Sequence, residues 1–183
     1  AARDVFIPLT VGGGIRSIED ISDVLRSGAD KVAINTAAID RPDFVGEAAR
    51  AFGSQCIVVS IEAKRNEKGW EAMTNNGREH SGRQVLDWAQ EVQELGAGEL
   101  LVTSVDQEGT RQGFDLELFQ QVHDLVKIPV IGCGGAGKAE DVVIAAKKGV
   151  ADAFCCASIF HFNSSSIPEV KHALVQAGIE VRT

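Results

Sequence analysis

Short apolar segments alternate six times with longer segments of helical periodicity along this chain of 183 residues. The apolar segments are rich in Val, Ile, Leu and Ala, as is typical of strands covered on both faces. The alternation predicts repeated β-α units around a parallel sheet. The expected strands are 7–11, 31–34, 56–61, 99–103, 129–132 and 153–156, and the expected helices are 18–27, 42–52, 84–95, 116–126, 139–148 and 167–177.

An internal repeat narrows the fold further. Ile7-Pro-Leu-Thr-Val-Gly-Gly-Gly aligns with Ile128-Pro-Val-Ile-Gly-Cys-Gly-Gly, and Glu19-Asp20 then falls on Glu140-Asp141. The two copies begin about half the length of a TIM barrel of roughly 250 residues apart. Two matching halves indicate an α/β fold, a TIM (β/α)8 barrel. Since six units are present, we expect a single partial barrel domain over 1–183 that holds the third to eighth units and is truncated before them.

One connection departs from the alternation. The segment 64–74 predicts a small β-hairpin with its turn near Lys68-Gly69, inserted after the third strand of this chain, which would be the fifth of a complete barrel. The polar run 75–83 is then expected to lead into the next helix without further structure.

Charge and hydropathy exclude several classes of function. The net charge of −8 offers no basic surface for nucleic acid or an anionic membrane. No apolar run reaches the roughly 20 residues that a membrane helix needs, and no signal peptide is evident at the start of the chain. We therefore expect a cytoplasmic protein that acts on small molecules.

The cysteines and histidines do not predict a metal site. Cys56, Cys133, Cys155 and Cys156 lie in apolar segments without C-x-x-C spacing, so buried reduced thiols are expected. Cys155 and Cys156 are adjacent on a strand and point to opposite faces. The four histidines share no element or spacing, which argues against zinc and against a catalytic triad. We expect no metal and no cofactor.

Glycine-rich turns after two strands predict phosphate binding. Gly12-Gly13-Gly14 and Gly134-Gly135 each leave backbone N–H groups unobstructed before a helix. A small polar corner follows each turn one strand later, at Asn35-Thr36 and Ala157-Ser158. Tight turns without a ligand are the alternative explanation for either copy. Two sites across a barrel mouth would suit an elongated substrate with a phosphate at each end.

Two carboxylates are candidates for acid-base chemistry, because barrel active sites lie at the carboxyl ends of the strands. Glu62 follows the third expected strand and Asp106 follows the fourth. A solvated carboxylate paired with Lys64 or Arg65 is the alternative for Glu62. A turn-stabilising role is the alternative for Asp106.

Motifs along nearly the whole chain resemble the cyclase subunit of imidazole glycerol phosphate synthase. They are Val11-Gly-Gly-Gly-Ile-Arg, Asp30-Lys31-Val-Ala-Ile-Asn35-Thr36-Ala-Ala, Phe52-Gly-Ser-Gln-Cys-Ile-Val-Val-Ser, Gly96-Ala-Gly-Glu99, Gly109-Thr110-Arg-Gln-Gly-Phe-Asp and Cys133-Gly-Gly-Ala-Gly. The resemblance implies a lyase of histidine biosynthesis. It would use ammonia to convert a bis-phosphorylated ribulosyl aminoimidazole carboxamide ribonucleotide into imidazole glycerol phosphate and aminoimidazole carboxamide ribotide.

The resemblance also implies roles for individual residues and a partner. Thr103 would line the pocket, and Lys31 with Glu99 would gate ammonia delivered by a glutamine amidotransferase. Gly14, Asn35 and Thr36 would hold one phosphate, and Gly134, Gly135, Ala157 and Ser158 the other. The family uses two catalytic aspartates. The first lies on a strand outside this chain, and the second is replaced here by Glu62, whose extra methylene would move the carboxylate by roughly 1.5 Å and could slow the reaction on the order of 100-fold.

Three alternatives remain open. The isomerase that acts one step earlier is a related barrel with the same duplicated phosphate sites, although the loop after Glu62 and the run 103–115 look like the cyclase. A barrel piece that binds phosphate or a glutaminase without turnover is the second, and we expect the isolated chain to be inactive. A paralogue serving surface-polysaccharide synthesis is the third.

Overall fold

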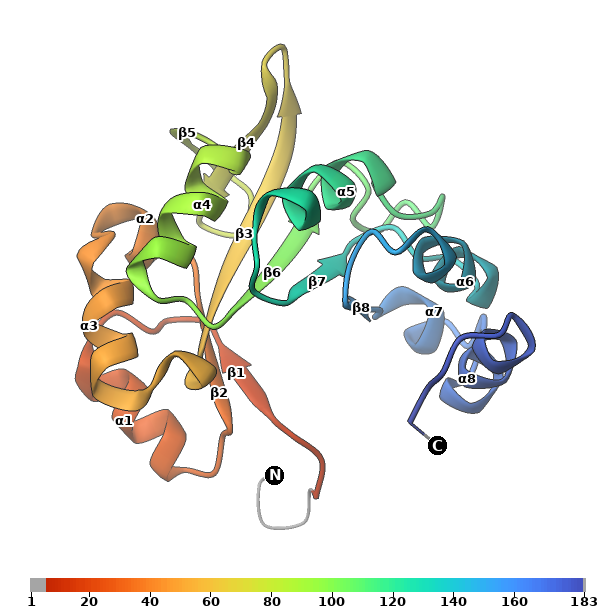
Figure 1. Ribbon diagram of the computed structural model, residues 1–183, viewed down its shortest axis with the longest axis horizontal. Helices are drawn as coiled ribbons and strands as arrows, with labels where there is room; N and C mark the ends of the chain where they lie inside the picture. The colour runs from red at the N-terminus through yellow and green to blue at the C-terminus, as the bar shows by residue number, and fades with distance from the viewer. Residues whose placement is uncertain (1–5, 183) are drawn as a thin grey trace.

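The six expected strands form one parallel sheet. The computed structural model describes residues 6–182, and within that range the parallel strands follow the order β1-β2-β3-β6-β7-β8 (Figure 1). Their bounds are Thr10–Gly12 for β1, Lys31–Ile34 for β2, Ile57–Asn66 for β3, Glu99–Ser104 for β6, Val130–Cys133 for β7 and Ala153–Cys155 for β8. The prediction of a partial TIM barrel is confirmed, although the first strand begins at Thr10 and not at residue 7.

Helices connect these strands and cover the outer face of the sheet (Figure 1). They are α1 Ile18–Arg26, α3 Asp43–Phe52, α4 Val85–Leu95, α5 Leu116–Leu125, α6 Ala139–Lys148 and α8 Ile167–Gln176. Two short helices were not expected, α2 Thr36–Asp40 and α7 Ser158–His161, and a 3-10 turn, η2, spans Ser54–Cys56. Both short helices begin at the polar corners of the repeat, so the two halves match in this detail also.

Hydrogen bonds confirm the internal repeat. Asp20 accepts from the N–H groups of Arg16 and Ser17 at 2.8 and 3.0 Å, which fixes the start of α1. Asp141 accepts from the N–H groups of Gly137 and Lys138 at the same two distances before α6. One strand later, Asp30 and Asp152 each accept from the N–H of a residue at the start of the preceding strand, Leu9 and Val130. The aligned acidic residues therefore do the same structural work in both halves.

Alternation along each strand divides the sheet into two faces. Val32, Val59 and Val102 point toward the helices and are fully buried in the core. The residues beside them in sequence, such as Ala33, Ser60 and Leu101, point to the concave face and line a cavity there. Because β1 and β8 each pair with a single neighbour among the described residues, this concave face is open at both edges.

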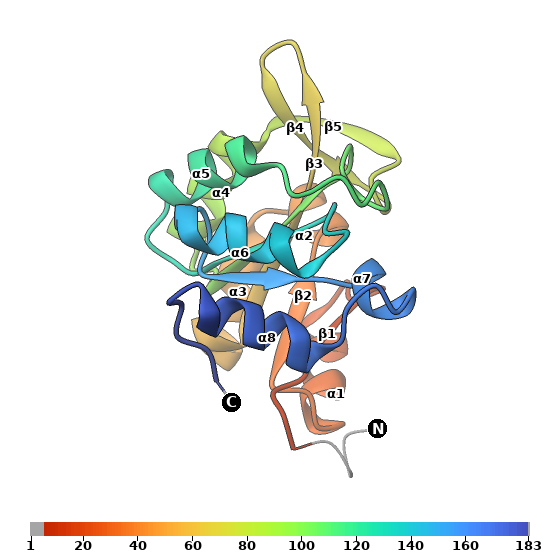
Figure 2. The ribbon, with the colours of Figure 1, turned by 90° about the vertical axis from the view of Figure 1, so that its right-hand side faces the viewer.

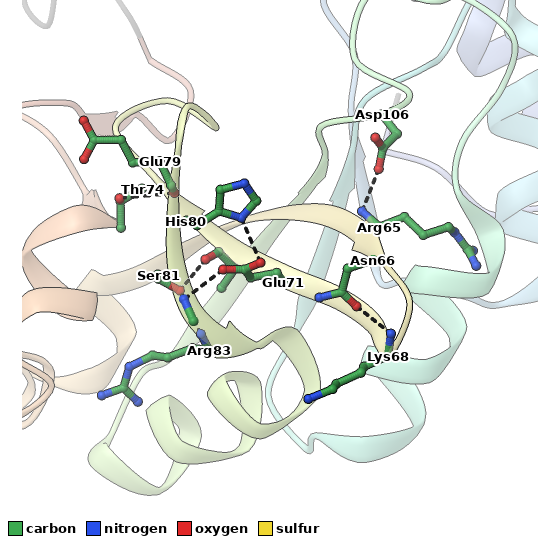
Figure 3. A network of polar contacts seen from close by, with 12 residues as sticks. Arg65, Asn66, Lys68, Glu71, Thr74, Glu79, His80, Ser81, Arg83 and Asp106 are labelled. Carbon is green, nitrogen blue, oxygen red and sulfur yellow. Dashed lines mark hydrogen bonds and ion pairs between the residues drawn. The ribbon is translucent and has the colours of Figure 1, made fainter.

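A three-stranded antiparallel arm projects beyond the parallel sheet (Figure 2). β3 continues to Asn66 and pairs with β4, Gly69–Thr74, so the predicted hairpin is confirmed. β4 then pairs with β5, Glu79–Gln84. The expectation that 75–83 is a plain connection was wrong, because β4 offers free backbone groups that this polar segment can satisfy. Side chains add to the pairing: Glu71 accepts from the N–H of Gly82 at 2.8 Å and lies 2.9 Å from a ring nitrogen of His80 (Figure 3).

Within the part of the chain that the structure describes, no helix combines the length and apolarity required to cross a bilayer.

Candidate functional site

The strand register places four polar side chains in one row across the concave face. Glu62 on β3 is opposite Thr103 on β6, and Thr103 is opposite Cys133 on β7. Cys133 is in turn opposite Cys155 on β8. All four lie at or near the carboxyl ends of their parallel segments, where barrel enzymes place their catalytic groups. We expected Glu62 to follow its strand, but β3 continues past it and holds its side chain in this row.

A cavity of about 1090 Å³ occupies the part of the concave face next to β1, β2 and β3. Four predicted site residues line it: Gly14, Asn35, Thr36 and Glu62. Arg16, Arg41, Ser60, Asn75 and Asn76 also line it, and sequence analysis did not single these out. Arg16 could have been found, since it directly follows the glycine turn. Asn75 and Asn76 could not, because only the pairing of β4 with β5 brings their turn over the cavity.

The first glycine turn and polar corner form a cradle that lines this cavity. Gly13 and Gly14 have φ values of 98° and 72°, and a Cβ on either would meet no atom within 4 Å. Both polar atoms of the Asn35 amide are buried, and neither has a hydrogen-bond partner among the described residues. The Thr36 hydroxyl accepts from the N–H of Asn75 at 3.1 Å. Buried amides without partners are rare, so the Asn35 side chain marks a place for a polar ligand.

The second glycine turn is packed tightly and does not line the described cavity. The carbonyl of Gly135 accepts from the N–H of Gly113 at 2.8 Å, and a Cβ on Gly135 would lie 2.1 Å from the Gly113 carbonyl oxygen. A Cβ on Gly134 would lie 2.8 Å from the carbonyl oxygen of Ser104. Close packing of the loop after β6 therefore explains both glycines structurally. Ala157 and Ser158 stand at the start of α7, one strand further on, and also lie outside the cavity.

Glu62 is half-buried, and no cation among residues 6–182 forms an ion pair with it. Its Oε2 atom is buried without a hydrogen-bond partner. Burial raises the pKa of the Glu62 carboxyl above its ordinary value, and the nearby backbone N–H of Gly77 opposes that rise only in part. Arg65, one of the two cations proposed as its partner, instead binds Glu117 at 2.7 Å. A carboxyl that retains its proton more readily than usual is suited to general acid-base chemistry.

Asp106 has a structural partner. Its Oδ2 atom accepts from the backbone N–H of Arg65 at 2.7 Å, so the loop after β6 is tied to the outer part of β3 (Figure 3). The side chain is exposed and does not line the cavity. This contact agrees with the alternative explanation of Asp106, in which the residue stabilises a turn and does not take part in acid-base chemistry.

Lys31 and Glu99 are brought together at the opposite, amino-terminal ends of β2 and β6. Lys31 Nζ lies 2.8 Å from Glu99 Oε2, and both side chains are partly buried. Only the family resemblance indicated this pair, because the two residues lie 68 positions apart in the chain. Their contact crosses the concave side of β3, which lies between β2 and β6 in the sheet.

The cysteines depart in part from the expectation of buried thiols. All four are free, but Cys155 is exposed on the concave face and lines the cavity. Cys156 points the other way and packs against the core, as the strand alternation requires. In the described range, no group of three or more His, Cys, Asp or Glu side chains is arranged to hold a metal ion.

A family model described as "Histidine biosynthesis protein" matches residues 1–166, which include every strand of the parallel sheet and the whole antiparallel arm.

Proposed function

Because the chain belongs to the histidine biosynthesis protein family, we propose that it provides the cyclase, a carbon-nitrogen lyase, of imidazole glycerol phosphate synthase. The reaction would consume ammonia and the bis-phosphorylated ribulosyl aminoimidazole carboxamide ribonucleotide. Its products would be imidazole glycerol phosphate and aminoimidazole carboxamide ribotide. The observation that carries this proposal is the unpaired, half-buried Glu62 carboxylate in the same cavity as the cradle of Gly14, Asn35 and Thr36.

The cradle supports binding of one phosphate. Backbone N–H groups at Gly13 and Gly14 are unobstructed, and the Asn35 amide can donate to an anion oxygen. Arg16 adds a positive charge at the cavity wall, where Asp40 and Arg41 also lie, Arg41 in an ion pair with Glu47. A second phosphate would bind near Gly134, Gly135, Ala157 and Ser158, beyond the row of Thr103 and the two cysteines. The substrate would then lie along the concave face with its reacting centre near Glu62.

Glu62 would act as proton donor and acceptor, with a pKa that burial raises above its ordinary value. The burial that raises its pKa increases the fraction of the protonated acid near neutral pH, while the carboxylate is still accessible as a base. Thr103, directly opposite on β6, would hold the substrate against it. Asp106 would contact substrate only if its hydrogen bond with the backbone N–H of Arg65 broke. In this structure it is therefore a positioning residue, which holds the loop after β6 against β3.

The Lys31–Glu99 pair supports the cyclase over the isomerase, because the isomerase does not use ammonia. A glutamine amidotransferase docked against the amino-terminal ends of the strands would release ammonia beside this pair. Opening of the 2.8 Å contact would let ammonia enter the concave side and travel toward Glu62. Lys31→Met should then impair turnover driven by glutamine in the presence of the glutaminase more than turnover driven by free ammonium.

The first experiment tests whether the cradle of Gly14, Asn35 and Thr36 binds phosphate. Titration calorimetry with inorganic phosphate should show binding that Thr36→Val and Asn35→Leu each weaken about tenfold, the loss of about one charge-assisted hydrogen bond. Ser54→Ala, in the η2 turn away from the cavity, is the matched control. Equal affinity in all four proteins would refute the cradle.

Turnover tests the reaction class. The chain would be assayed alone and with a polypeptide carrying two further β-α units of the family, using the ribulosyl substrate and ammonium. Ammonia-dependent consumption that Glu62→Gln lowers at least 100-fold would support the cyclase. Isomerisation of the ribosyl precursor without ammonia would instead assign the related isomerase, and substrate binding without either reaction would assign a non-catalytic barrel.

A further inference from the structure

Cys133 and Cys155 face each other across neighbouring strands. The β7–β8 register pairs them directly, and both point to the concave face. Neighbouring strands lie about 4.8 Å apart, which is inside the range of roughly 4.4–6.8 Å between the Cα atoms of a disulfide. Both thiols are free in this structure. The two residues are therefore close enough for a bond to form between their sulfur atoms.

The other two cysteines lack this arrangement. Cys156 follows Cys155 directly and points to the opposite, helix-covered face, where it packs against the hydrophobic core. Cys56 lies in the η2 turn before β3. Each is a free thiol of the same chain, so each serves as an internal comparison for the pair.

The environment of the pair favours one nucleophile and one protonated partner. A hydrogen bond from the Cys133 thiol lowers the pKa of Cys155 to about 7, despite the opposing effects of burial and of Glu108. The same hydrogen bond, together with burial, raises the pKa of Cys133. Cys155 is also exposed and lines the cavity, so a small reagent can reach it. Low thiol pKa and accessibility are the two conditions for rapid oxidation of a cysteine.

We propose that Cys133 and Cys155 form a dithiol site that hydroperoxides oxidise to a disulfide between β7 and β8. The Cys155 thiolate attacks the terminal oxygen of a hydroperoxide, forms an S–O bond and releases the alcohol, or water from hydrogen peroxide, as the O–O bond breaks. The Cys133 sulfur then attacks the sulfenic sulfur, forms the S–S bond and releases water. Two thiols lose two electrons in all and one peroxide gains them.

This disulfide would join the two strands immediately before Gly134-Gly135 and two residues before Ala157. It would therefore fix the spacing between the second glycine turn and the start of α7, whatever ligand binds there. The site is independent of the proposed cyclase activity, because neither the peroxide reaction nor its product requires the substrate.

Mass spectrometry of the intact chain tests the proposal. After brief exposure to one equivalent of hydrogen peroxide, the protein should lose the mass of two hydrogen atoms, and alkylation under denaturing conditions should label two thiols where it labelled four before. Peptide mapping should identify a Cys133–Cys155 link that dithiothreitol removes. Cys56→Ser and Cys156→Ser should still form it, and Cys133→Ser should stop oxidation at a Cys155 sulfenic acid, trapped by dimedone.

A second measurement avoids substitutions altogether. Phenylarsine oxide condenses with two neighbouring thiols, forming two As–S bonds and releasing water, and should bind the native chain one to one and protect Cys133 and Cys155 from iodoacetamide. A link between Cys155 and Cys156, sulfinic acid at Cys155 with Cys133 still free, or oxidation of Cys56 at the same rate as Cys155 would each overturn the proposal.

Discussion

Lys31 and Glu99 form an ion pair with an N–O distance of 2.8 Å between the first residues of β2 and β6, which are separated by β3. The Lys31 side chain is 34% exposed and that of Glu99 16%. Partial burial strengthens the attraction between the two charges and also increases the cost of leaving either of them alone.

A double-mutant cycle with Lys31→Met and Glu99→Gln should measure that attraction. We expect a coupling free energy of about 1 kcal/mol in urea unfolding, at the upper end of the range for surface pairs. The Arg41–Glu47 pair is the control, because its contact is 2.6 Å long but its side chains are 53% and 39% exposed. Its coupling should be about 0.3 kcal/mol. Equal coupling in the two pairs would show that burial adds nothing at the amino-terminal ends of the strands.

Glu62→Gln should change how stability depends on pH. The unfolded carboxyl ionises near its ordinary value of 4.5, and burial raises the pKa in the folded state. Between those two values the folded protein binds more protons than the unfolded chain, so the wild type loses stability as pH rises through that window. Glutamine does not ionise, so the variant should gain stability relative to wild type between a pH below 4.5 and an alkaline pH above the raised pKa of the folded carboxyl.

Urea midpoints at the two pH values measure this difference, and Glu67→Gln, in the exposed turn between β3 and β4, is the control. The Glu67 variant should track the wild type at both. If the Glu62 variant does so as well, burial does not raise the pKa of Glu62.

Alanine at the two glycine turns should have unequal effects on stability. Gly13 has a φ of 98° and open space around its Cα, so Gly13→Ala should cost only the backbone strain, about 1–3 kcal/mol. Gly135 has a φ of 105°, and an added Cβ would lie 2.1 Å from the Gly113 carbonyl oxygen. Displacing that backbone should add a further cost of about 1–3 kcal/mol. Guanidinium unfolding of both variants checks the order, and a Gly135 variant as stable as the Gly13 variant would contradict the observed packing.

Asp115→Ala should destabilise the β3–β4 hairpin near its turn. Asp115 Oδ1 accepts from the Leu118 N–H at 3.1 Å and caps α5, and Oδ2 accepts from the Trp70 indole N–H at 3.1 Å. Loss of the cap costs about 1 kcal/mol, and the buried indole N–H without an acceptor costs about 1–3 kcal/mol more. Asp115→Asn should lie between, because its single oxygen can serve the cap but its amide nitrogen cannot accept from Trp70.

Unfolding followed by tryptophan fluorescence and by circular dichroism measures both losses. In a Trp70→Phe background, Asp115→Ala should cost only the cap. An unchanged cost in that background would mean that the indole bond contributes nothing to stability.

Local sequence patterns were sufficient for the parallel sheet. Strands such as β2 and β6 each hold three consecutive apolar residues after a charged first residue, and helices such as α1 and α6 carry acidic residues in their first turns, so type and order could be predicted directly. β5 could not be predicted, because Glu79–Gln84 is polar and without apolar alternation. It is a strand because β4 presents unpaired backbone groups beside it.

Some residues of the candidate site could likewise be predicted from local sequence patterns, and others could not. Glycines before a helix and carboxylates after a strand are local signals, so the residues of the first cradle and Glu62 could be named from the chain alone. Asn75 and Asn76 reach the cavity through the pairing of β4 with β5. Cys133 and Cys155 meet because the register of β7 and β8 places them opposite each other. A slip of one residue in that register would turn every side chain of the strand to the other face of the sheet.

By itself, the sequence determined the β-α repeat, the symmetry of its two halves and the chemical character of the glycine turns, because each depends on neighbours within one or two elements. The tertiary structure decided which side chains lack partners and which side chains meet. Buried polar atoms of Glu62 and Asn35 have no hydrogen-bond partner among the described residues. Lys31 and Glu99 form an ion pair, Asp106 accepts a hydrogen bond from the Arg65 N–H, and the two thiols of β7 and β8 face each other. Those outcomes depend on strand register and on burial, and both are properties of residues brought together from distant parts of the chain.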